Sequence, residues 1–142
     1  MTLKEFINLA IQDKTNKKIT FSLGKLSQAE IEKLAIETGF DLTDFERTID
    51  NYSIKHTLKK HGNAKTESNR GQIAVEEQDF EHIPEIVANA DTILSNEKND
   101  LGNTLIKYVK DLFSTNYFYV EEIRTGKKQV NLQTLYKRKV RK

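Results

Sequence analysis

The stretch TLIKYVKDLFSTNYFYVEEIRTGKKQVNLQTLY, residues 104–136, determines the fold class that the sequence predicts. β-branched and aromatic residues recur along it in three runs, as is typical of strands. These strands are expected at Thr104–Leu112, Tyr117–Arg124 and Lys128–Tyr136. The connections Ser114–Asn116 and Thr125–Lys127 are short enough for hairpins, so consecutive strands should pair antiparallel. With a shorter run at Thr92–Leu94, the sequence predicts a four-stranded antiparallel sheet.

The residues before position 91 favour helices. Residues 3–11 place apolar side chains at helical spacing, and Ser27-Gln28-Ala29-Glu30 is a capping box that satisfies free amides at a helix start. Further helices are expected at 43–50, at 53–62 and around Pro84. Ile19–Leu23 alternates and predicts a short strand, and the polar residues 63–72 predict a loop.

Helices followed by an antiparallel meander define the α+β class, with N-terminal helices packed on one face of a C-terminal sheet. The 142 residues are enough for one domain with a hydrophobic core. We expect an N-terminal helical leader at 1–18, the domain itself at 19–138 and a basic tail at 139–142.

The composition is that of a soluble globular protein, with 37% hydrophobic and 31% charged residues. No apolar run approaches the length that spans a membrane, and the charged start Met1–Glu5 breaks the hydrophobic core of a signal peptide. The absence of cysteine excludes disulfides and thiolate zinc sites. We expect a cytoplasmic protein that does not engage a membrane and is a monomer when free.

The net charge of +2 is unevenly distributed. Residues 127–142 hold seven Lys or Arg and no acid, and residues 53–70 hold five against one acid. Such segments attract nucleic acid through counterion release, although a basic tail can also be merely solvated. Residues 76–91 hold six acids and no Lys or Arg.

Two of the three histidines lie in the run Ile54–Gly62. His56 and His61 are five residues apart, so on a helix they point about 140° from each other and cannot share a face. His56 shares its face with lysines that include Lys60, and a histidine beside cations can move protons next to a phosphate. The alternatives are an exposed surface residue for His56 and a capping histidine over the last helical turn for His61.

A zinc site is the obvious rival for these histidines. Their spacing does not match the i, i+4 pair of a helix-borne metalloprotease, and no glutamate follows the first histidine. His82 would reach them only through a tertiary contact. Glycine-rich phosphate loops are also missing from the sequence, and we expect neither a metal nor a cofactor.

The last predicted strand carries a pair of hydroxyl groups. With a two-residue period, Thr134 and Tyr136 share a face with Val130 and Leu132, at the polar end of an apolar strip. The pair could donate to a phosphate, or both residues could be ordinary strand formers. Arg124 could make a bidentate phosphate contact, or it could pair with a neighbouring glutamate.

The order of these motifs resembles a known family. The motifs, in chain order, are Ile54-Lys55-His56, Lys60-His61-Gly62, Gly71-Gln72-Ile73, Phe80 with Ile83-Pro84-Glu85-Ile86-Val87, and Thr134-Leu135-Tyr136-Lys137. Together they are similar to the phage-associated Barnase/EndoU/colicin/RelE-like (BECR-fold) nucleases, which occur in phage head-morphogenesis proteins and in polymorphic toxins. The resemblance, over residues 19–137, implies RNA cleavage and points to His56, His61, Thr134 and Tyr136 as the catalytic positions.

The function implied is that of a metal-independent endoribonuclease. Cleavage without a metal uses the ribose 2′-hydroxyl as the nucleophile and leaves a 2′,3′-cyclic phosphate, so the substrate would be RNA. We expect Lys60, Arg124 and Lys137 to bind it, and a toxin of this kind would have a cognate immunity or antitoxin protein. The alternatives are a non-catalytic nucleic-acid-binding module and a protein-interaction domain of phage origin whose partner surface is the acidic segment 76–91.

Overall fold

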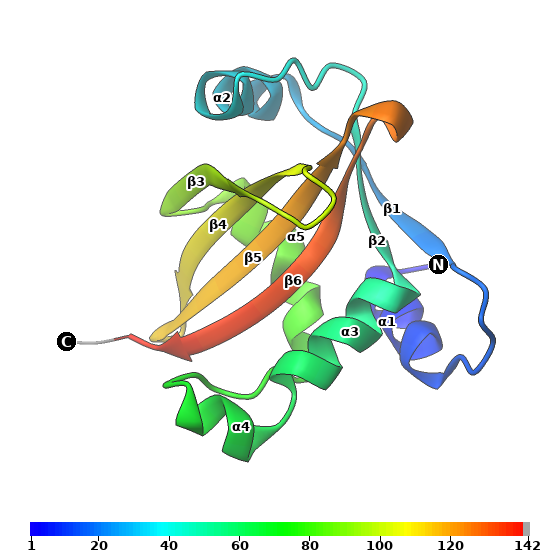
Figure 1. Ribbon diagram of the computed structural model, residues 1–142, viewed down its shortest axis with the longest axis vertical. Helices are drawn as coiled ribbons and strands as arrows, with labels where there is room; N and C mark the ends of the chain where they lie inside the picture. The colour runs from blue at the N-terminus through cyan, green and yellow to red at the C-terminus, as the bar shows by residue number, and fades with distance from the viewer. Residues whose placement is uncertain (141–142) are drawn as a thin grey trace.

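Six strands form one mixed sheet in the order β1-β2-β6-β5-β4-β3 (Figure 1). The computed structural model describes residues 1–140. The strands are β1 (Thr20–Lys25), β2 (Glu46–Asp50), β3 (Thr92–Lys98), β4 (Thr104–Leu112), β5 (Thr115–Arg124) and β6 (Gln129–Lys139). Neighbouring strands run antiparallel except β2 and β6, which are parallel. The α+β class is as predicted, but the sheet is neither four-stranded nor purely antiparallel, because β1 and β2 extend it beyond β6.

Five α-helices surround this sheet in the described residues. They are α1 (Leu3–Gln12), α2 (Gln28–Thr38), α3 (Asn51–His61), α4 (Ala64–Asn69) and α5 (Ile83–Ala88). Short 3-10 helices are formed by η1 (Glu77–His82) and η2 (Thr125–Lys127). Figure 1 shows α5 behind the sheet and α3 running beside β6. None of the helices in residues 1–140 is long and apolar enough to cross a membrane.

The helix predicted at 43–50 is wrong, because this segment contains β2. Asp44 has a positive φ of 66°, which interrupts any helix there. Residues 47–50 are all buried, since β2 lies between β1 and β6 and is covered on both faces. A strand in such a position has no polar alternation that would distinguish it from a short helix.

The loop predicted at 63–72 is also wrong, because residues 64–69 form α4. Asn63 caps this helix by accepting a hydrogen bond from the Thr66 amide at 3.0 Å. Glu67 of the same helix is fully buried. Two of the polar residues that suggested a loop are therefore the helix cap Asn63 and the buried carboxylate Glu67.

A β-bulge in β6 changes the faces that its residues occupy. Leu132 and Thr134 pair with successive residues of β5, so Gln133 is the extra residue. Thr134 and Tyr136 share a face, as predicted. Val130 and Leu132, however, turn to the opposite face and are buried in the core. The apolar strip expected next to Thr134 is therefore wrong, because the bulge shifts the two-residue period by one.

The two faces of the sheet have different partners. The core face, defined by Tyr119 and Leu135, packs in one apolar cluster with Phe80, Ile83 and other buried side chains of η1 and α5. Helix α1 belongs to the same cluster through Phe6, Ile7 and Ala10. The segment expected to be a leader thus contributes to the main core. Of the expected tail 139–142, Lys139 ends β6, whereas Arg141 and Lys142 lie outside the described residues.

The path of the chain places α3 along β6. Strand β2 pairs with the first third of β6, where Thr48 is opposite Asn131. Helix α3 starts directly after β2, with Asp50 as its N-cap. After α4 the chain returns to β6, where the Ile73 amide donates to the Lys137 carbonyl. Between these two attachments α3 lies beside the second half of β6, which carries Thr134 and Tyr136.

Candidate active site

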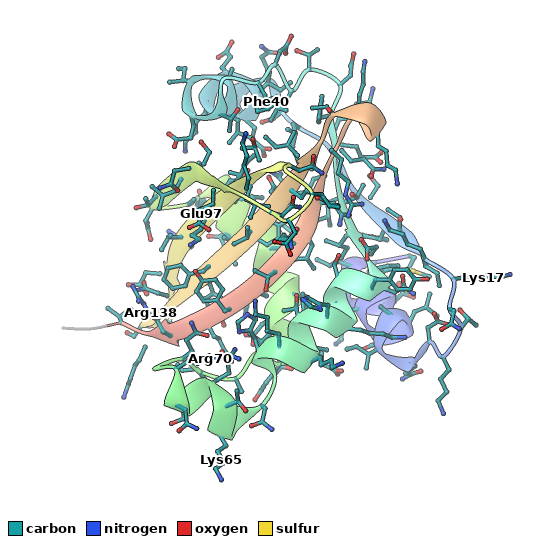
Figure 2. The ribbon with its side chains drawn as sticks, viewed as in Figure 1. Lys17, Phe40, Lys65, Arg70, Glu97 and Arg138 are labelled. Atoms are coloured by element: carbon teal, nitrogen blue, oxygen red, sulfur yellow. The ribbon has the colours of Figure 1, made fainter. Side chains whose placement is uncertain are left out.

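A cleft of about 740 Å³ opens on the face of the sheet opposite the core. One wall is α3, the floor is β4, β5 and β6, and the other wall is the β3–β4 hairpin. Glu97, labelled on β3 in Figure 2, belongs to the hairpin wall. The predicted site residues that line this cleft are His56, Lys60, Arg124, Thr134 and Tyr136. The tertiary structure therefore brings together residues that lie up to 80 positions apart in the chain.

Helix α3 divides its side chains between the cleft and the core. Ile54, Thr57 and His61 fall at i, i+3 and i+7 and are buried. His56 and Lys60, one turn apart on another side of the helix, face the cleft. The predicted divergence of His56 and His61 on the helix is thus observed. Of these two histidines, only His56 lines the cleft.

The bulge in β6 places two consecutive side chains in the cleft. Gln133 and Thr134 both line it, although neighbours in a regular strand point to opposite faces. The Thr134 hydroxyl is shielded from solvent and has no hydrogen-bond partner within residues 1–140. Buried hydroxyls are normally hydrogen-bonded in folded proteins. The Thr134 hydroxyl makes no such bond, so it does not stabilise the fold.

Tyr136 stands between two aromatic rings. Phe118 of β5 stacks on it with ring centroids 4.7 Å apart and planes 4° apart. His61 of α3 stacks on it at 5.5 Å and 29°. Since β6 lies between β5 and α3, these rings approach Tyr136 from opposite sides. Tyr136 lines the cleft, and its ring has no free face on which a base could stack.

His61 is held from behind by a buried carboxylate. Its Nδ1 lies 3.1 Å from Oε2 of Glu67, and Arg70 donates to Oε1 of the same carboxylate at 2.9 Å. Figure 2 shows Arg70 beside α4, and Arg70 does not line the cleft. Burial lowers the pKa of His61 more than the Glu67 carboxylate raises it. His61 is therefore a neutral, 6% exposed side chain that supports Tyr136 from outside the cleft.

Glu122 is a carboxylate in the cleft that the sequence analysis considered only as an ion-pair partner. It is 3% exposed and accepts from Arg124 Nε at 2.5 Å, from Asn103 at 2.9 Å and from Asn99. Burial alone would raise its pKa, but these hydrogen bonds outweigh it, and the Glu122 pKa is lowered. The ion pair foreseen as the alternative for Arg124 therefore exists, and Arg124 also lines the cleft.

Lys107 is a further cleft residue that the sequence analysis missed. It lies on β4 opposite Val120, with Nζ 5.8 Å from the centre of the Tyr136 ring and 3.8 Å from Glu97. The two-residue period of the predicted strand places Lys107 on the face shared by Val120 and Glu122 once the hairpin is assumed. That signal was available in the sequence, but the bulge that brings Gln133 into the cleft was not.

Lys137 lies away from the cleft. It pairs with Tyr117 on the core face of the sheet, and its Nζ is 2.9 Å from Asp79. The same carboxylate accepts from the Tyr117 hydroxyl at 2.7 Å. Burial, and then the hydrogen bond to Asp79, raises the pKa of Tyr117 strongly. The expected substrate-binding lysine is thus engaged in a buried contact near η1, because alternate residues of β6 face opposite sides.

Residues 1–140 contain no group of three or more His, Cys, Asp or Glu side chains that could hold a metal ion. The third histidine, His82, is in edge-to-face contact with Tyr117, with ring centroids 5.4 Å apart. In the structure it accompanies neither His56 nor His61, so the tertiary contact that a three-histidine site requires is not formed.

An α+β domain whose cleft joins an imidazole, ammonium groups and hydroxyls has the chemical groups of a phosphodiester-cleaving protein, and the sequence comparison agrees. The chain belongs to the family described as phage-Barnase-EndoU-ColicinE5/D-RelE like nuclease 3, which matches residues 24–142. The resemblance inferred from the motif order is thereby confirmed, and the family is one of nucleases. Comparison with curated proteins and with solved structures found no significant match.

Proposed function

We propose that the protein is an endoribonuclease that cleaves RNA in the cleft between α3 and β6. The observation that carries the proposal is the meeting of His56 and Lys60 with Thr134 and Tyr136 in one cleft. Nuclease family membership supports the reaction class, and the choice of RNA rests on chemistry. The imidazole, ammonium and hydroxyl groups of the cleft are suited to proton transfer and charge stabilisation, and RNA carries its own nucleophile in the 2′-hydroxyl.

His56 is the proposed general base. It is exposed at the cleft side of α3, and it can accept the 2′-hydroxyl proton while the 2′-oxygen attacks the phosphorus. Attack forms the 2′,3′-cyclic phosphate and breaks the bond between phosphorus and the 5′-oxygen. A proton must then reach that 5′-oxygen from the opposite side of the phosphate.

Tyr136 is the proposed general acid, because it enters the cleft from the sheet floor, whereas His56 enters it from the helix wall. Both of its ring faces are packed, which holds the hydroxyl in one direction. Lys60 and Lys107 would stabilise the charge that develops on the phosphoryl oxygens. A rotation of Thr134 about χ1 would add its unpaired hydroxyl to the same oxygens. His61 is not a proton donor in this scheme.

The decisive experiment is incubation with RNA and with DNA of the same sequence, each with and without a chelator. We expect RNA products with 2′,3′-cyclic ends in both chelator conditions and no cleavage of DNA. Salt-sensitive RNA binding without products would favour the non-catalytic module instead. Cleavage of DNA, or complete inhibition by the chelator, would contradict the proposed mechanism.

A further inference from the structure

The floor of the cleft carries two cationic ends separated by a carboxylate. Val120, Glu122 and Arg124 occupy one face of β5 and line the cleft. Thr134 is the partner of Val120 and marks the end beside His56. Residues four apart on a strand lie about 13 Å apart, so the backbone of Arg124 is far from the proposed scissile phosphate. Along this floor, Glu122 therefore lies between Arg124 and the proposed catalytic groups.

The Glu122 carboxylate occupies the middle of this floor. It is buried and hydrogen-bonded to Arg124 and to two asparagines, and these bonds favour its ionised form. An ionised carboxylate repels a phosphate in the same position. The uncharged part of a nucleotide, by contrast, can lie against Glu122 and the Gln133 amide beside it. The charge order along the floor is therefore positive at Lys107, negative at Glu122 and positive at Arg124, with Glu97 of the hairpin wall 3.8 Å from Lys107.

The ion pair with Glu122 orients the Arg124 guanidinium but occupies only its Nε. Its Nε donates to Glu122, and the terminal nitrogens make no hydrogen bond with residues 1–140. Its side chain is 23% exposed and lines the cleft. A guanidinium fixed through Nε leaves its outer edge free for bidentate contact with a phosphate.

Lys18 adds a second cation at this end. Its Nζ lies 4.0 Å from Asp50, and its side chain is 35% exposed. Asp50 accepts a hydrogen bond from Asn131 Nδ2 at 2.8 Å, and Asn131 is the β6 partner of Glu122, so Lys18 lies near the Glu122–Arg124 pair. Burial, and then the nearby charge of Arg124, lowers the Lys18 pKa. Lys18 does not line the cleft itself and precedes residues 24–142, which match the nuclease family.

We propose that Arg124 and Lys18 form a second phosphate subsite, which binds the phosphate next to the scissile one. This inference rests on the proposed ribonuclease function. The positive, negative, positive order complements a nucleotide segment with two phosphates and an uncharged nucleoside between them. A cleft of about 740 Å³ is of the size that accommodates a small ligand, such as a short nucleotide segment.

The test compares a dinucleoside monophosphate with the same compound carrying one additional terminal phosphate, at the 5′ or at the 3′ end. The measured quantity is the ratio of kcat/KM with and without that phosphate. For the wild-type protein we expect a ratio of about 10 or more at one end only, as for a charge-assisted contact. Arg124→Gln should bring the ratio close to 1, and Lys18→Gln should lower it partly.

Lys25→Gln is the matched control, because Lys25 is an exposed β1 lysine that pairs with Asp44 and does not line the cleft. It should keep the wild-type ratio. If the wild-type protein cleaves neither compound nor longer RNA, the proposed function fails. If it cleaves the unmodified compound and the ratio is close to 1 at both ends, only the second subsite is overturned. A ratio that survives both Arg124→Gln and Lys18→Gln would also overturn it.

Discussion

The imidazole of His61 stacks on the phenol ring of Tyr136, with the ring centroids 5.5 Å apart. This contact separates the tasks of the two histidines in the motif. His56 lines the cleft, whereas His61 packs against Tyr136 of the cleft floor without lining the cleft itself. The spacing of five residues thus places the two histidines on different faces of α3. The proposed chemistry requires only His56 for proton transfer.

Replacement of His56 tests the general base. We expect His56→Ala to lower kcat for RNA cleavage by about 10²–10⁴-fold, as is usual for a lost proton-transfer residue. Stability should be unchanged, because His56 is exposed. Lys59→Ala is the control, since Lys59 is also exposed on α3 but does not line the cleft. Full activity of His56→Ala would exclude His56 from the mechanism.

Two replacements of His61 distinguish support from catalysis. His61→Phe keeps an aromatic ring against Tyr136 and should retain cleavage within a few-fold, with an unchanged pH–rate profile. His61→Ala removes the ring and should lower both kcat and stability, the latter by about 2 kcal/mol or more. Cleavage rates measured across pH give the answer. Loss of one limb of the profile in His61→Phe would identify His61 as a proton donor or acceptor instead.

The lowered pKa of His61 should also make the stability of the protein depend on pH. The pKa of His61 is lowered by burial, so the unfolded chain binds a proton more readily than the folded protein. The free energy of unfolding should therefore fall as the pH decreases from about 6.5, the unfolded pKa, through the lower folded value. Urea unfolding at pH values above about 5 keeps the carboxylates ionised. His61→Phe should flatten this dependence, and an equal slope in both proteins would contradict it.

Thr134→Val should separate stability from activity. The Thr134 hydroxyl is shielded and unpaired, so its replacement by a methyl group should raise the free energy of unfolding by about 1 kcal/mol. RNA cleavage should fall, because a donor to the phosphoryl oxygens is lost. Thermal unfolding and kcat are measured on the same preparation. A variant with unchanged kcat would remove Thr134 from the proposed site.

Tyr136→Phe tests the general acid without disturbing the ring stack. Phe keeps both aromatic contacts and lacks only the hydroxyl, so Tm should change little. We expect kcat to fall by about 10²-fold or more while RNA binding persists. Comparable cleavage by Tyr136→Phe would transfer the role of acid to another residue of the cleft, with Lys60 as the first candidate.

Production in cells addresses the proposed role as a toxin. Cleavage of cellular RNA should arrest growth on induction, and His56→Ala should restore growth at the same protein level. Rescue of the wild-type protein by a co-produced partner would identify an immunity or antitoxin protein. Normal growth with active protein in the cytoplasm would argue against a toxin.

Local sequence patterns were sufficient for much of this fold. The cap at Ser27, the stop at Gly39 and the hairpin strands at 104–136 depend on contacts between residues close in sequence, and the structure contains them. The segment 43–50 could not be assigned in this way. Its conformation is set by strands β1 and β6, and β6 lies more than 80 residues further along the chain.

The sequence by itself determined the α+β class, the family and the opposed directions of His56 and His61, because helix periodicity and motif order are local properties. Only the tertiary structure decided that Thr134 faces the cleft with Gln133, that Glu122 lies between two cationic ends, and that Lys137 points away. The physical reason is that a bulge in β6 and the attachment of α3 along that strand arise from pairing with distant residues, which no local pattern encodes.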